Sequence, residues 1–113
     1  MTNIIINLTP HKINIMDEEG NVIKVFKSEG EARAAQNDVK IGMLEGIPII
    51  ETEFGEPVDL PEYDQGTYYI VSAITAKAAD LNGRNTRDLL LTGKTVRNSD
   101  GQIIGCQALA KYK

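Results

Sequence analysis

Three of the chain's four arginines, Arg84, Arg87 and Arg97, lie within fourteen residues of one another in a protein of net charge −4. A guanidinium group binds a carboxylate or a phosphate through two parallel hydrogen bonds, so a few converging arginines can hold a small anion. Asp88 lies in the same segment and belongs to the same candidate site. The alternative, in which these arginines pair with nearby aspartates on the surface, fits the sequence equally well.

Three polar residues at the ends of expected strands complete the candidate ligand-binding set. Ser72 lies where a strand gives way to a helix, and there it can either help to bind a phosphate or cap the helix, the commoner role. Thr9 and His11 flank Pro10 after a buried strand, and a side chain that closes this turn is a commoner role for His11 than catalysis. If the bend belongs to a site, His11 should lie close to Ser72 of the same or a neighbouring subunit.

The sequence predicts no catalytic residue, no metal site and no cofactor, and we therefore expect a protein that is not an enzyme. His11 is the only histidine and Cys106 the only cysteine, and neither has a partner of the kind that a metal site or a catalytic triad needs. No nucleophile elbow or phosphate-binding glycine loop surrounds Ser72. Cys106 follows an apolar run, and a buried, inert thiol is expected there.

The composition indicates which classes of partner the protein could bind. Lysines and arginines are scattered without a run of three, so duplex nucleic acid and anionic membrane surfaces are poor candidates, whereas a small anionic ligand is allowed. A single cysteine excludes an intramolecular disulfide. The first residues do not have the pattern of a secretory signal peptide, and no apolar run approaches the about 20 residues that span a bilayer. We expect a cytoplasmic protein.

The amino-terminal half is expected to consist of strands. Residues 3–8 have the composition of a buried strand, and the alternation at Ile13 and Ile15 predicts a second one. The turn at residues 17–21 joins it to a strand over 22–26. Residues 29–36 have mixed helix and strand character, of which we favour strand.

The remainder alternates between strands and loops around one helix. Residues 47–50 predict a strand, and residues 54–66 a polar, mobile loop rich in proline, glycine and acids. A strand over 67–71 leads into a short amphipathic helix that should end near Asn82 and Gly83. A hairpin around residues 98–101 is expected to end the chain.

These elements predict one domain, residues 1–113, of the α+β class. We expect a mainly antiparallel sheet or partial barrel of about six strands, with one short helix packed on it. Edge strands and an acidic surface favour a homo-oligomer, in which a site could form between subunits.

Several segments resemble a group of small, mostly uncharacterised bacteriophage and prophage proteins that begin with an N-L-T-P-H segment. The matching segments are Ile6 to His11, Tyr69 to Ser72, Arg87 to Leu90 with Gly93, and Val96 to Cys106. The chain has Leu89 where that pattern often carries a second acid, and Thr92 where it often carries a proline. The resemblance implies a viral or mobile-element origin and no established chemistry.

Two functions follow as expectations. The first is a non-enzymatic binder of a small anionic, nucleotide-like ligand, which in a phage would be a sponge that sequesters a nucleotide-derived immune signal in the cytoplasm of the host cell. The second is a protein-interaction module that inhibits or adapts a host or virion protein, supported by the acidic surface and the loop over residues 54–66.

Overall fold

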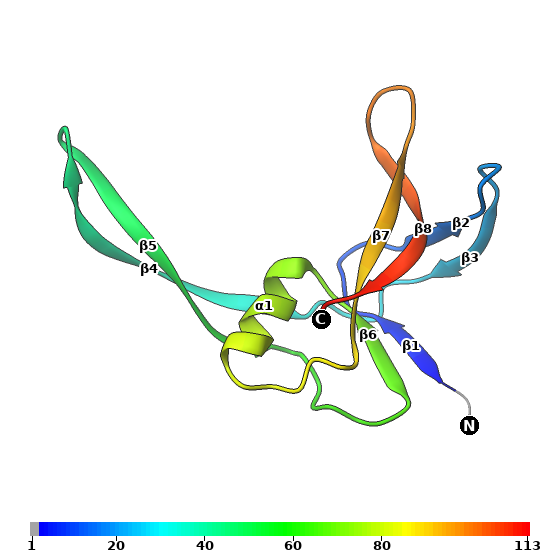
Figure 1. Cartoon of the computed structure of the whole chain (residues 1–113), viewed down its shortest axis with the longest axis horizontal. Coiled ribbons are helices and arrows are strands. Elements are labelled where there is room, and N and C mark those ends of the chain that lie inside the picture. Colours follow the sequence, from blue (N-terminus) through cyan, green and yellow to red (C-terminus); the bar gives the residue numbers. More distant parts are fainter. Residues whose placement is uncertain (1–2) are drawn as a thin grey trace.

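The computed structural model describes residues 3–113, and within that range the chain forms eight strands and one helix (Figure 1). The strands are β1 (Ile4–Asn7), β2 (Ile13–Met16), β3 (Val22–Phe26), β4 (Arg33–Leu44), β5 (Ile47–Val58), β6 (Thr67–Ile70), β7 (Leu89–Arg97) and β8 (Ile103–Lys111). The helix is α1 (Ala73–Leu81). No helix in the described range has both the length and the apolar character that a membrane crossing requires.

Six of the described strands form one sheet in the order β1-β6-β7-β8-β2-β3. The expected α+β class, six-stranded sheet and short helix are confirmed, but the expected mainly antiparallel pairing is wrong. Strands β1 and β6, β6 and β7, and β8 and β2 pair in parallel, so the sheet is mixed, and it stays open at β1 and β3. Strands β6 and β7 are parallel because the chain crosses from one to the other through α1, and such a crossover returns the chain in the same direction.

Helix α1 covers one face of this sheet because its buried side chains are small. Ala76, Ala78 and Ala79 are fully buried. Ala76 and Ala79 pack in one cluster with Tyr69 of β6 and Leu89 of β7, and the helix backbone also lies beside β4 and β5. The helix begins at its cap, Ser72, whose Oγ accepts a hydrogen bond from the backbone N–H of Thr75. It ends where Gly83 adopts a φ of 81°, as the sequence predicted.

Strands β2 and β3, which we call the wing, continue the sheet beyond β8, and their side chains help to form a second buried cluster. Ile13 of β2 belongs to a buried cluster with Ile70 and Cys106, against which Phe26 of β3 also packs. The wing approaches β8 at Gly105, where an added Cβ would lie 2.6 Å from the sulfur of Met16. Only glycine allows this approach, so Gly105 determines how closely β2 lies beside β8.

Strands β4 and β5 form a separate two-stranded ribbon that extends away from the sheet (Figure 1). Its two-residue turn, Glu45 and Gly46, has positive φ at both positions, as tight hairpins require. The favoured strand over residues 29–36 is confirmed from Arg33 onward. The expected loop over 54–66 is wrong for residues 54–58, which continue β5. The radius of gyration is 16.8 Å, whereas a compact domain of about 100 residues has about 13 Å, because the ribbon lies outside the body.

Candidate functional site

Arg84 uses its side chain for hydrogen bonds within the protein. It follows the end of α1, and its guanidinium donates to both carboxylate oxygens of Asp88 at 2.8 and 2.9 Å. The other donors bond the carbonyl oxygen of Pro61 at 3.2 and 2.6 Å and that of Asn85 at 2.7 Å. Arginine has five N–H donors in total. All of them are used, so Arg84 has none left for a ligand.

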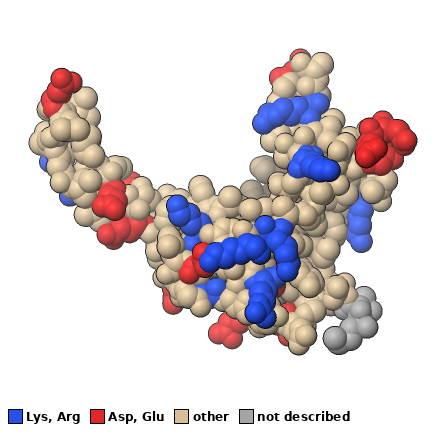
Figure 2. All heavy atoms as spheres, in the orientation of Figure 1, with Lys and Arg blue, Asp and Glu red and all other residues tan. Residues whose placement is uncertain are grey.

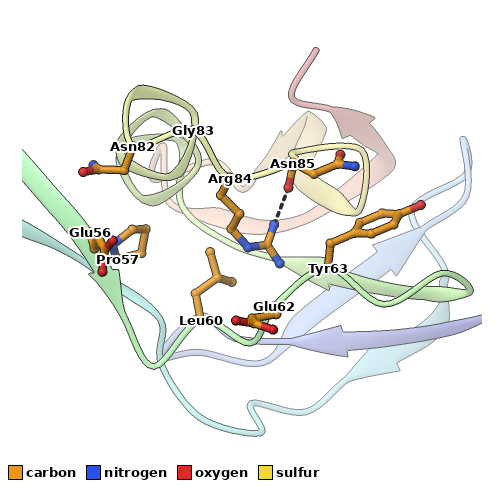
Figure 3. A pocket seen from close by; sticks show the side chains of 9 residues that line it. All are labelled: Glu56, Pro57, Leu60, Glu62, Tyr63, Asn82, Gly83, Arg84 and Asn85. Atoms are coloured by element: carbon orange, nitrogen blue, oxygen red, sulfur yellow. Dashed lines mark hydrogen bonds between the residues drawn. The ribbon is translucent and has the colours of Figure 1, made fainter.

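A hollow of about 450 Å³ lies beside Arg84 (Figure 3). Glu56 and Glu62 contribute to its lining, together with Leu60 and Tyr63. Asp88 already neutralises the guanidinium, so the remaining charge on the lining is negative. This hollow therefore does not suit the anionic ligand that the arginines suggested.

Asp88 is the other half of a buried ion pair. Its side chain is 1% exposed and that of Arg84 is 15% exposed. The pair joins the loop before β6, through Pro61, to the start of β7, and the carbonyl oxygen of Asp88 accepts the backbone N–H of Tyr69. Of the two alternatives that the sequence left open, salt-bridge pairing is the one that the structure shows for Arg84 and Asp88.

Ser72 and Thr9 line a common hollow of about 370 Å³ with Arg33, beside the amino end of α1. Their hydroxyl groups are already bonded within the protein. Ser72 Oγ donates to Thr75 Oγ1 and accepts from the Thr75 N–H, and Thr9 Oγ1 donates to the side-chain oxygen of Asn7. Ser72 therefore acts as a helix cap in this structure.

Asn7 holds the bend that contains Thr9 and His11, and the sequence reasoning did not select it. Its side chain is fully buried. The amide nitrogen donates to the carbonyl oxygens of His11 and Phe26 at 2.8 and 3.0 Å, and the amide oxygen accepts from the N–H and hydroxyl of Thr9. The sequence did contain one sign of this role, because Asn7 is a carboxamide at the end of an apolar strand, directly before Leu8 and Thr9.

His11 is exposed and does not line the hollow that contains Ser72. It lines a groove of about 510 Å³ with Lys12 of the bend and with Ile103 and Ile104 of β8. Ser72 faces the other hollow, at the end of the helix. Within the described part of one chain, His11 and Ser72 therefore line different hollows.

Arg87 lies in a separate hollow of about 180 Å³, which we call the basic hollow and define by Tyr63, Tyr68, Arg87 and Lys111. The sheet register explains the arrangement, because Leu90 of β7 pairs with Lys111 of β8 and Tyr69 of β6 pairs with Leu89. Within residues 3–113, neither Arg87 nor Lys111 forms an ion pair.

Basic side chains gather on the central part of one face of the molecule, although the protein is acidic overall (Figure 2). The carboxylate on the lining of the basic hollow is that of Asp88, and Arg84 already neutralises it. The two cations of the hollow therefore present an uncompensated positive charge. No sequence pattern pointed to the tyrosines or Lys111, because sheet pairing between distant segments brings them together.

Arg97 lies at the other end of β7 from Arg87. Its guanidinium donates to the carbonyl oxygen of Gly101 at 2.7 Å and so closes the turn between β7 and β8. A strand rises about 3.3 Å per residue, so the two arginines are roughly 30 Å apart. The three arginines that are close in sequence thus occupy three different places.

Cys106 is buried, as expected, and burial raises the pKa of its thiol. The thiol is therefore protonated at neutral pH and a poor nucleophile. In the described part of the chain, no three side chains of the metal-ligating types histidine, cysteine, aspartate or glutamate come together in a group that could hold a metal ion.

No family model matches this chain, and neither do the curated proteins or the solved structures that were compared with it. Function is therefore inferred from the side chains and hollows of the chain itself. The basic hollow is the strongest candidate for a binding site, because its cations are exposed and have no acidic partner in the described residues.

Proposed function

We propose that the protein binds a small anionic, nucleotide-like ligand and does not change it chemically. The observation that carries this proposal is the basic hollow, in which two unpaired cations and two phenol rings line one site. In the bacteriophage setting that the sequence resemblance implies, such a protein would be a sponge for a nucleotide-derived immune signal of the host.

The chemistry of the hollow suits a phosphate with a ring attached to it. Arg87 offers a planar fork that bonds two phosphate oxygens at once, and Lys111 adds a second positive charge. Tyr63 and Tyr68 offer aromatic faces on which a base can stack. The volume of about 180 Å³ is below the roughly 300 Å³ at which enclosing ligand pockets begin. The phosphate would therefore enter the hollow, and the rest of the ligand would lie across its rim.

The hollow lacks an activated group for catalysis among its lining side chains. Asp88 is the carboxylate there, and Arg84 bonds both of its oxygens. A general base must have a free lone pair within reach of the proton that it removes. The side chain of Asp88 is 1% exposed, so its remaining lone pairs are out of reach of a ligand, which supports binding without turnover.

Replacing Arg87 by alanine should weaken the affinity for the ligand by about 1.5–3 kcal/mol, the range for a hydrogen bond to a charged group. This corresponds to roughly a 10- to 150-fold rise in Kd. The guanidinium of Arg87 makes no hydrogen bond within the described residues, so stability should change little. Titration calorimetry and thermal melting with a panel of cyclic mono- and dinucleotides measure the two effects.

Arg97→Ala is the matched control, because it removes the same side chain at the far end of β7. Its Kd should equal that of the wild-type protein. The proposal fails if no member of the panel shifts the melting temperature of the wild-type protein, since a ligand that binds only the folded state must raise it by mass action. It also fails if the two variants lose affinity equally.

A second candidate function is a protein-interaction module, and one observation favours it. The ribbon of β4 and β5 exposes apolar side chains near its turn, which is typical of a surface that another protein covers.

A further inference from the structure

The ribbon formed by residues 37–53, which we call the arm, has an apolar tip that its own chain leaves uncovered. Five large apolar side chains near the turn are each more than half exposed: Ile41, Met43, Leu44, Ile47 and Ile50. Leu44 pairs with Ile47 and Met43 with Pro48, and successive pairs in a ribbon point to opposite faces. Both faces of the tip are therefore apolar, so a partner must enclose it to shield it from water.

A surface of matching character lies on the body, in the groove between β2 and the hairpin of β7 and β8. This groove of about 510 Å³ includes Ile103 and Ile104, which are both exposed, along with His11 and Lys12. The neighbouring edge strand β3 exposes Val22, Ile23 and Val25 in addition. An exposed apolar edge strand is a surface that natural proteins usually cover.

The charges of the arm and the groove are opposite. The arm carries four carboxylates, those of Asp38, Glu45, Glu51 and Glu53, against one lysine, a net charge of −3. Lys12 lines the groove, and Lys94 lies on β7 between two other lining residues, Thr92 and Thr95. Opposite potentials favour the association of an arm with a groove and disfavour contact between two arms.

We propose that the arm of one copy of this chain occupies the groove of a second copy, and that the second arm returns to the groove of the first. The arm and the hairpin of β7 and β8 stand on either side of an open concave surface, which the space-filling view also shows (Figures 1 and 2). A second copy related by a two-fold axis fills this space with its own body. Two-fold pairs are the commonest symmetric assembly of identical chains.

The area of the arm is sufficient for a stable pair. Eight residues of each strand make a ribbon about 27 Å long and about 10 Å wide, with about 270 Å² on each face. Enclosing both faces of two arms, with equal areas on the receiving bodies, buries about 2,000 Å², at the upper end of the range for specific interfaces. This inference depends on the arm and the groove and is independent of the proposed ligand.

Sedimentation velocity of the full chain should give twice the monomer mass of 12.4 kDa. The double variant Leu44→Glu with Ile47→Glu should give the monomer mass with unchanged near-ultraviolet circular dichroism, because both residues lie at the exposed tip. Ile103→Glu, in the groove, should do the same. The matched control, Ile74→Glu with Leu81→Glu, places the same charges on exposed positions of α1 and should remain a dimer.

A charge exchange tests the position of the arm in the groove. Glu45→Lys and Lys12→Glu should each weaken the dimer, and the combination of both should restore it. A monomeric wild-type protein, an assembly of more than two copies, a dimeric tip variant, or failure of the combined charge exchange to restore association would each overturn the proposal.

Discussion

Replacing Asp88 by alanine is expected to lower the free energy of unfolding by about 3–5 kcal/mol, the usual effect of removing one partner from a buried ion pair. Asp88 is 1% exposed and bonds Arg84 through both carboxylate oxygens. Without it, the guanidinium keeps its bonds to Pro61 and Asn85 but remains largely buried with an uncompensated charge. Small domains are stable by only about 5–15 kcal/mol, so this variant should lose a large part of its stability.

Urea denaturation followed by circular dichroism measures this loss. Asp100→Ala is the control, since Asp100 lies exposed in the turn between β7 and β8 and should change stability by less than about 0.5 kcal/mol. Asp88→Asn keeps one hydrogen-bond acceptor without the charge and should fall between wild type and Asp88→Ala. If Asp88→Ala were as stable as the control, the ion pair would not be what attaches β7 to the loop that precedes β6.

Replacing Asn7 by alanine is expected to lower the free energy of unfolding by about 2–4 kcal/mol, because each buried group that is left unbonded costs about 1–3 kcal/mol. The fully buried amide bonds the carbonyl oxygens of His11 and Phe26 and the N–H and hydroxyl of Thr9. Its loss removes this partner from the N–H of Thr9 and the carbonyl oxygen of Phe26 at the junction of β1, the bend and the end of β3, whereas the hydroxyl of Thr9 still donates to the carbonyl oxygen of His11.

Hydrogen exchange shows which part of the protein loses stability in Asn7→Ala, whereas urea denaturation measures the loss in the free energy of unfolding. The amide of Glu29, which bonds the carbonyl oxygen of Asn7, should lose protection, but the amides of α1 should change less. Asn37→Ala removes an exposed carboxamide on the arm and is the control. If Asn7→Ala were as stable as Asn37→Ala, the bend would be held by contacts other than the amide of Asn7.

Local patterns predicted the local structure well. The helix followed from the spacing of its apolar residues and from Ser72 and Gly83 at its ends, and the structure shows the helix with both caps. The turns at residues 17–21 and 98–101 followed from their residue types, because turn geometry depends on a few neighbouring residues.

Arrangements that depend on distant segments could not be predicted in the same way. Arg87 and Arg97 are close in sequence, but β7 is extended between them and keeps them apart. Conversely, Tyr68 and Lys111 are far apart in sequence, and the pairing of β6 and β8 with β7 brings them to one hollow. Parallel pairing leaves little trace in a single strand's pattern, so the mixed sheet was missed.

The arm shows why apolar patterns can mislead. Residues 47–50 were correctly predicted as a strand, but the apolar side chains of this strand and its partner remain exposed at the tip. A sequence indicates that such side chains need to be covered and does not say which chain covers them. Residues 54–58 were assigned to a loop because proline and glycine are rare in strands, whereas β5 is part of a two-stranded ribbon with edges that tolerate them.

Recovery of a bound nucleotide after heat denaturation tests most directly whether this protein binds its ligand without changing it. The protein is mixed with each member of the panel of cyclic mono- and dinucleotides and is then separated from free nucleotide by gel filtration. The protein fraction is heated, and the nucleotide that it releases is analysed by chromatography. We expect the wild-type protein and Arg97→Ala to release at least one nucleotide intact, and Arg87→Ala to retain much less of it. Recovery of a cleaved product, or the absence of any retained nucleotide, would contradict the proposed function.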